Sequence, residues 1–198
     1  MPADVDYFGK LTLQSQITGQ IIHELHDFYI QDPSKDTHKI LDLIRVAKKK
    51  RQDNLLELNK AFITPVDKEA ISRVYSNLHW IDLSIKHLII EMDTYEIYNI
   101  VDYNMILELL KKSIKTLSAG FDLLNKKKFN EILTHVNEAI HNDNLLIKEY
   151  AIQINKLFKK DDIQVILPYK EILSQLKEIS KRMHFCANQL EDIVFKMN

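Results

Sequence analysis

The chain has 198 residues, of which 45% are hydrophobic and 28% charged, and its formal net charge at pH 7 is -1. This composition can bury a substantial core, and the small net charge excludes a global field that would attract nucleic acid or lipid. With only 3 glycines and 4 prolines, the chain has few residues for tight turns, which predicts long helices joined by few loops.

Cysteine usage and the amino terminus bear on the compartment. The single cysteine, Cys186, excludes an intramolecular disulfide and a multi-cysteine metal site, and we expect it to be a small buried hydrophobe. Residues 1–10 contain no basic region followed by an apolar run, so they are not typical of a secretory signal. These features predict a cytoplasmic protein without direct membrane insertion and without a nucleic-acid partner.

The first predicted helix runs from about Asp4 to Tyr29. Its apolar residues recur at helical spacing, and they are Tyr7, Phe8, Leu11, Ile21, Ile22, Leu25, Phe28 and Tyr29. The segment 31–36 then breaks the helix, because Pro33 restricts the preceding residue to extended geometry. Ser34 or Asp36 can cap the next helix.

The second predicted helix ends near Phe62, and its apolar stripe has a gap. The stripe consists of Leu41, Ile44, Leu55, Leu58 and Phe62. Between Ile44 and Leu55, the inward positions fall on Lys48 and Arg51. We therefore expect a polar group near this face of the core.

Between Asn59 and Ile71, a signal for the end of the second helix is followed directly by a signal for the start of a third. Thr64 can cap a third helix with its hydroxyl, Pro65 suits the first helical position, and Asp67 favours the positive helix end. This helix is predicted to continue to about Tyr98. Its stripe comprises Ile71, Val74, Tyr75, Leu78, Ile81, Ile85, Leu88, Ile89 and Met92.

Three more helices are predicted in the second half. Asp102 can cap the fourth, whose apolar residues are Met105, Ile106, Leu109, Leu110, Leu117, Phe121 and Leu124. The fifth carries Phe129, Ile132, Leu133, Val136, Ile140, Ile147, Ala151, Ile154, Leu157 and Phe158, with a polar gap at Asp143 and Asn144. The sixth ends near Lys196, with Pro168 in or near its first turn, and carries Ile172, Leu173, Leu176, Ile179, Met183, Cys186, Leu190 and Val194.

The two halves of the chain resemble each other. The segment 58–62 (LNKAF) recurs ninety-six residues later as 154–158 (INKLF), and the apolar stripes upstream of it match as well. Downstream the offset grows by two residues, so that Ile81 corresponds to Ile179. We predict an all-α fold in which six long antiparallel helices form two pseudo-symmetric three-helix bundles, 1–98 and 99–198, within a single domain, 1–198.

Catalytic motifs are weak in this sequence. It contains no glycine-rich phosphate loop, nucleophile elbow or dinucleotide fingerprint. A ferritin-like di-iron enzyme needs two Glu-x-x-His motifs, and only 138–141 (EAIH) has this spacing. The pairs His23 with His26 and His79 with Asp82 could each touch one ion, but polar surface groups explain them better. Trp80 is expected to pack at a helix contact.

The stretch 58–71 (LNKAFITPVDKEAI) resembles the bend of the PhoU-like proteins, specifically the single-chain branch associated with Pit-type inorganic phosphate permeases. The segments 156–158 (KLF), 170–172 (KEI) and 187–196 (ANQLEDIVFK) support the resemblance. It implies a cytoplasmic, non-enzymatic regulator or accessory of phosphate transport, with a permease or other transport component as partner. A generic helical scaffold and a helical metal-binding protein or di-iron enzyme are the alternatives, and homo-oligomerisation is left open.

PhoU-like proteins often hold iron or zinc clusters through paired acids one helical turn apart, but the corresponding positions differ here. The resemblance places these pairs on Ile44 and Lys48, on His79 and Leu83, on Lys177 and Lys181, and near Asp143 and Asn144. Asp82 and Glu178 lie one residue away from two of these pairs, about 100° around the helix. Cations repel a divalent metal. We therefore expect no metal site, no cofactor and no catalytic residues, while Lys48, Lys177 and Lys181 are either solvated or part of a small anion site.

Overall fold

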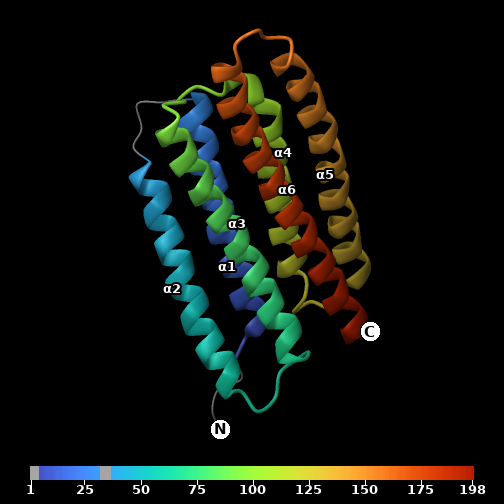
Figure 1. Cartoon of the computed structure of the whole chain (residues 1–198). Coiled ribbons are helices and arrows are strands. Elements are labelled where there is room, and N and C mark those ends of the chain that lie inside the picture. Colours follow the sequence, from blue (N-terminus) through green and yellow to red (C-terminus); the bar gives the residue numbers. More distant parts are fainter. Residues whose placement is uncertain (1–4, 32–36) are drawn as a thin grey trace.

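The computed structural model describes residues 5–31 and 37–198 (Figure 1). Over these residues the chain forms six α-helices and no strand, which confirms the predicted fold class. The α-helices are α1 (Tyr7–His26), α2 (His38–Lys60), α3 (Lys68–Thr94), α4 (Asn104–Asp122), α5 (Phe129–Leu157) and α6 (Ile163–Met197). A π-helical turn, η1 (Asp27–Gln31), extends α1, and a short 3-10 turn, η2 (Val101–Tyr103), precedes α4.

The helices pack as two groups of three. Helix α1 contacts α2 and α3, whereas α4 contacts α5 and α6, and the groups meet where α1 packs on α4 and α3 packs on α6. Figure 1 shows α2 and α5 on opposite flanks of these four central helices. Each half of the chain thus contributes three helices, while the internal symmetry of the two halves stays a prediction.

The apolar stripes of α1, α3 and α6 form most of the core. All eight apolar residues predicted for the first helix are buried, although α1 begins at Tyr7 and continues as η1 after His26. The predicted stripes of α3 and α6 are buried as well, including Cys186. Burial raises the pKa of this thiol to about 12, in accordance with the expected role as a small hydrophobe. Asp4, Pro33, Ser34 and Asp36 lie outside the described residues.

The end of α2 differs from the prediction. The helix ends at Lys60, and the backbone of Ala61 is extended. Phe62, which the stripe placed in the core, is therefore fully exposed beside the exposed Ile63. The apolar periodicity extends past the point at which the backbone leaves the helix, so this part of the prediction is wrong.

The start of α3 is also three residues later than Thr64 and Pro65 suggested. Asp67 is the capping residue, and its carboxylate accepts a 2.7 Å hydrogen bond from the Ala70 amide. Asp67 gains a further partner, because Lys196 near the end of α6 lies 2.8 Å from its other oxygen. The negative charge of Asp67 interacts favourably with the positive end of the helix, and this favours Asp67 over the uncharged Thr64 as the cap.

The polar gap in α2 is filled differently from the prediction. Lys48 is exposed and Arg51 is half-buried, while Ala47 and Asn54 take the inward positions. The polar group near this part of the core is therefore Asn54, together with Gln14 from α1, and the inward assignment of Lys48 is wrong. Burying the charged amino group of Lys48 without a partner would cost more free energy than leaving it in water.

Helices α4 and α5 also deviate in detail. Tyr103, not Asp102, precedes α4, and no side chain caps that helix. Met105 is exposed, as are Ile147, Ala151 and Phe158 of the predicted fifth stripe. In α5, Asn142, Asp143 and Gln153 take inward positions instead, whereas Asn144 is exposed. Pro168 lies in the second turn of α6, whose cap is Asp162.

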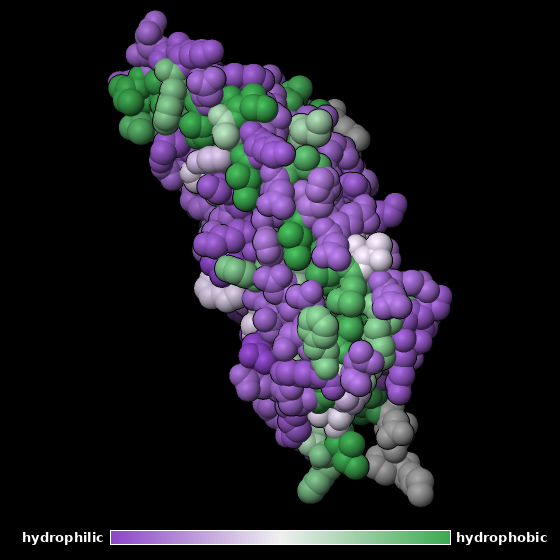
Figure 2. Space-filling view, turned by 90° about the vertical axis from the view of Figure 1, so that its right-hand side faces the viewer, coloured by the Kyte–Doolittle hydropathy of each residue, from purple (hydrophilic) through white to green (hydrophobic). Residues whose placement is uncertain are grey.

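Among the described residues, none of the helices combines the length and hydropathy that crossing a bilayer requires. Figure 2 shows hydrophobic surface at both ends of the molecule. At one end, the exposed apolar residues include Phe62 and Ile63, and at the other Phe158, Ile163 and Leu167.

Candidate functional site

A buried carboxyl group, Asp82, lies between α3 and α1. The Thr18 hydroxyl donates a 2.8 Å hydrogen bond to Asp82 Oδ1, whereas Oδ2 has no hydrogen-bond partner among the described residues. Asp82 is only 1% exposed, and this burial raises its pKa to about 8, although the Thr18 bond opposes the shift. A pKa near 8 makes this carboxyl group mostly neutral at pH 7.

Gln14 extends this polar layer to α2. It lies one turn before Thr18 on α1, is fully buried, and its amide nitrogen donates a 3.1 Å hydrogen bond to the carbonyl oxygen of Ala47. Its side-chain oxygen has no partner among the described residues. Two neighbouring turns of α1 thus use polar side chains to contact α2 and α3, in a region where apolar packing would be the default.

A second buried carboxylate, Asp143, lies on α5 in the other half of the molecule. Ser180 donates a 2.5 Å hydrogen bond to Oδ1, and the Nδ1 atom of His184 lies 2.8 Å from Oδ2. Both partners come from adjacent turns of α6, so Asp143 fixes the register of α5 on α6. The neighbouring Asn142 is fully buried, and neither atom of its amide has a hydrogen-bond partner within the described part of the chain.

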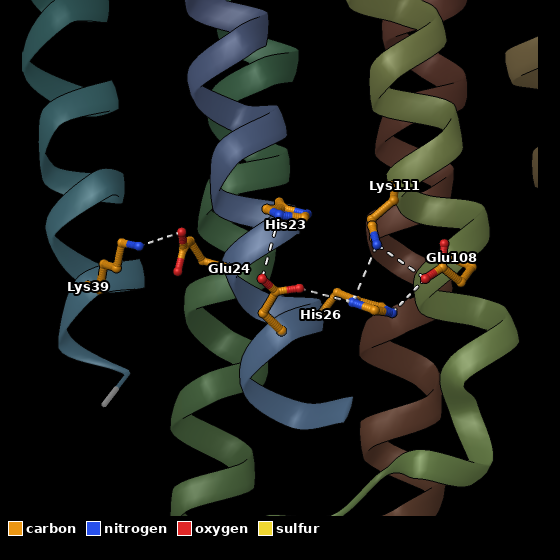
Figure 3. Close-up of polar contacts among 7 residues, drawn as sticks. His23, Glu24, His26, Lys39, Glu108 and Lys111 are labelled. Atoms are coloured by element: carbon orange, nitrogen blue, oxygen red, sulfur yellow. Dashed lines mark hydrogen bonds and ion pairs between the residues drawn. The ribbon is translucent and has the colours of Figure 1, made fainter. Parts of the chain in front are cut away.

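A third polar cluster connects the end of α1 to α4 (Figure 3). His26 is 3% exposed, and its Nε2 atom lies 2.7 Å from Glu108 Oε1 and 3.1 Å from Asn104 Oδ1. Its Nδ1 atom lies 3.3 Å from Asp27, the first residue of η1, and Lys111 contacts both His26 and Glu108. Asp27 also lies 3.5 Å from His23, so its carboxyl group contacts both histidines at the end of α1.

The histidine pairs considered from the sequence do not converge on an ion. His23 is exposed and contacts Asp27, whereas His26 faces Glu108 on α4. His79 is half-buried, and burial, with the neighbouring charges of Arg51 and Lys48, lowers its pKa. Its companion Asp82 is directed to Thr18 instead.

The positions at which the resemblance implies metal-binding acids do not fit a multinuclear cluster. Ile44 is buried and Lys48 exposed, while Lys177 and Lys181 are exposed on α6 and lie over the rings of Tyr150 and Phe185 at 4.6 Å and 5.8 Å. Such sites need several bridging carboxylates, and among the positions that the resemblance implies only Asp143 is a carboxylate. Lys48 lies on α2, which packs mainly on α1 and α3, whereas Lys177 and Lys181 lie on α6, and a shared anion site of the three lysines stays untested.

Other candidate ligands are dispersed. Glu138 pairs with Lys112 at 3.2 Å, His141 is exposed, and Glu178 pairs with Arg182 at 2.6 Å. Over residues 5–31 and 37–198, no group of three His, Cys, Asp or Glu side chains is placed to hold a metal ion. That the protein lacks iron and zinc stays a prediction, and elemental analysis of protein purified without chelator should find well under one ion per chain.

Sequence reasoning missed Thr18, Gln14, Ser180 and His184 as partners of the buried layer. A signal existed for α1, because Gln14 and Thr18 are spaced by four residues between the apolar Leu11 and Ile21. A polar residue at an inward position predicts a buried hydrogen bond. For Ser180 no comparable signal distinguished a buried hydroxyl from an exposed one.

Comparisons with known proteins identify the fold of the chain. No family model matches the chain. It is 28% identical over 151 residues to the UPF0111 protein YkaA of Bacillus subtilis (strain 168), covering 71% of this chain and 69% of that protein. The crystal structure of a PhoU-like protein from Shewanella oneidensis MR-1 matches with a TM-score of 0.83 at 11% identity, over 96% of this chain and 99% of that one. The chain therefore has the PhoU-like fold that the resemblance of the bend implied.

Proposed function

We propose that this protein is a non-enzymatic, cytoplasmic regulator or accessory of inorganic phosphate transport that acts through protein–protein contacts. The observation that carries the proposal is the PhoU-like fold over nearly the whole chain. The bend sequence 58–71, with its resemblance to the branch associated with Pit-type permeases, adds the link to phosphate.

The surface of the molecule supports a role in protein contacts. Phe62 and Ile63 are exposed side by side in the α2–α3 connection, and they belong to the stretch that carries the resemblance. Exposing two large apolar side chains is unfavourable in water unless a partner covers them. A partner that packs on this end of the molecule would remove them from solvent.

Deletion of the gene tests the proposed function. We expect altered uptake of radiolabelled phosphate at low or high external phosphate, restored by the wild-type gene supplied in trans. Unchanged uptake at both concentrations would contradict a role in phosphate transport. A Pit-type permease gene adjacent to this gene, and co-purification of the two products, would identify the partner.

A Phe62→Ser, Ile63→Ser variant tests the contact. Both side chains are exposed, so the substitutions should leave the thermal unfolding temperature almost unchanged. We expect the variant to fail to restore phosphate uptake. Full restoration by this variant would show that the α2–α3 connection does not form the contact.

A further inference from the structure

A surface groove of about 320 Å³ lies where α3 packs on α6, at the junction of the two halves. Its α3 side is lined by Arg73, Ser76, Asn77 and Trp80, and its α6 side by Arg182, Phe185, Asn188 and Gln189. These residues are three or four positions apart, so they form one continuous stripe on each helix. We call this feature the α3–α6 groove.

The charged residues that line the α3–α6 groove are arginines, and the carboxylates that contact them, Glu69, Asp192 and Glu178, lie outside its lining. Its lining includes two arginines and no carboxylate. Arg73 lies 3.6 Å from Glu69 and 3.5 Å from Asp192, which is longer than a good hydrogen bond, so its guanidinium is available to a better acceptor. Arg182 pairs with Glu178, and its Nε atom is buried without a hydrogen-bond partner among the described residues.

The rest of the lining suits a peptide. Trp80 and Phe185 are 45% and 40% exposed, and the Arg182 guanidinium lies over the Trp80 ring at 5.2 Å, which holds both side chains in place. Between the two arginines lie Asn77, Asn188 and Gln189, whose amides can both donate to and accept from a peptide backbone. Tryptophan and arginine contribute most often to the binding energy of protein interfaces.

We propose that the α3–α6 groove binds a short, extended, acidic peptide segment of a partner protein. Carboxylates of this segment pair with Arg73 and Arg182, and an apolar side chain between them packs on Trp80 and Phe185. The Arg182 guanidinium lies over the Trp80 ring, and Trp80 is seven residues from Arg73 on α3, so about 10 Å along the helix axis separates the two arginines. This distance corresponds to about three residues of an extended peptide. The segment therefore carries two acidic residues separated by two or three positions. This inference depends on the proposed function only in that both involve protein contacts.

Selection from a phage-displayed library of random dodecapeptides on the purified full chain tests the proposal without knowledge of the partner. We expect the enriched peptides to contain spaced Asp or Glu residues with an aromatic or aliphatic residue between them. A synthetic enriched peptide should change the fluorescence of Trp80, the single tryptophan of the chain. Enriched peptides without acidic residues, failure to enrich any peptide, or binding that leaves Trp80 fluorescence unchanged would overturn the proposal.

Three variants locate the binding. Asn188→Asp adds a carboxylate to the groove with almost no change in volume, and Arg73→Glu reverses a charge at an exposed side chain. Each should weaken binding of the synthetic peptide by about tenfold or more, because Arg73→Glu turns a favourable charge contact into a repulsive one and Asn188→Asp adds a repulsive charge. Lys86→Glu is the matched control, since Lys86 is exposed on α3 outside the groove.

Equal weakening by all three variants would show non-specific attraction to a basic surface and would overturn the proposal. Circular dichroism melting curves verify that each variant is folded. Failure of the peptide experiment would leave the effect of gene deletion on phosphate uptake unaffected, so the two proposals can fail independently.

Discussion

Asp82 and Asp143 are both buried carboxyl groups that accept a hydrogen bond from a hydroxyl, but their surroundings differ. Asp82 has Thr18 as its hydrogen-bond partner and keeps one oxygen unpaired, whereas Asp143 has Ser180 on one oxygen and His184 on the other. Burial of a carboxylate without enough partners raises its pKa until the group takes up a proton. The difference shows two ways to accommodate an acid in a helical core: protonation in the first half and hydrogen bonding in the second.

The internal repeat makes this difference more informative. By the offsets between the halves, Asp82 corresponds to Ser180, and Asp143 corresponds to Ala47. The predicted repeat thus puts one buried acid of each half near the same level, on the third helix of the first half and on the middle helix of the second. The partner also changes, from a hydroxyl on α1 to a hydroxyl and an imidazole on α6.

The largest effect is expected from Asp82→Asn. Because folding raises the pKa of Asp82 from 3.8 to about 8, the folded state binds the proton more tightly, and stability falls as pH rises from about 4 towards 8. At about 1.4 kcal/mol per pKa unit, the loss by pH 7 is on the order of 4 kcal/mol. The asparagine variant should be more stable than wild type at pH 7 and should lack this pH dependence. Urea unfolding measured at several pH values between 4 and 8 tests this.

The same measurements on wild type supply the control. If the free energy of unfolding does not fall between pH 4 and pH 8 more steeply in wild type than in Asp82→Asn, the carboxyl group is not protonated in the folded state. In that case water or another partner stabilises the charged form.

The matched substitution Asp143→Asn should act in the opposite direction. The carboxylate accepts from Ser180 and contacts His184, and an amide provides weaker acceptors and one donor in place of an acceptor. We expect a loss of about 1–2 kcal/mol in the free energy of unfolding at pH 7. Chemical denaturation of both Asp→Asn variants at pH 7 gives the comparison directly. An increase in stability here would show that the two acids are accommodated in the same way.

A smaller effect is expected from Thr18→Val, which replaces the hydroxyl by a methyl group of similar size. Asp82 then loses its hydrogen-bond donor, and because this bond lowers the pKa, the variant should have a still higher pKa at this position. We expect a loss of about 1 kcal/mol, greater at pH 8 than at pH 5. Thermal melting at these two pH values measures the difference, and an equal loss at both would argue that Thr18 contributes packing alone.

The smallest effect is expected from Ser180→Ala. Asp143 keeps His184 as a partner, so removal of the hydroxyl should cost about 0.5–1 kcal/mol. The double variant Ser180→Ala, Asp143→Asn should lose less free energy of unfolding than the two single variants lose together, since both substitutions remove the same contact. Full additivity in the double-mutant cycle would contradict direct coupling between the two side chains.

Much of the helical core followed from sequence alone. The stripes of α1, α3 and α6 were predicted residue by residue, because apolar residues at intervals of three and four leave one face that must be removed from water. The six helices and the PhoU-like resemblance of the 58–71 bend also followed from local patterns.

Tertiary structure decided the helix ends and the polar interior. Phe62 continues the stripe of α2 in the sequence, yet it is exposed because the helix ends at Lys60. Asp82 directly follows Ile81 of the predicted stripe, but its burial and its bond to Thr18 depend on α1 packing against the side of α3 that carries it. Periodicity defines which face of a helix is apolar. It does not define which neighbour covers the edge of that face, and at that edge a polar side chain is buried or exposed according to the helix packed beside it.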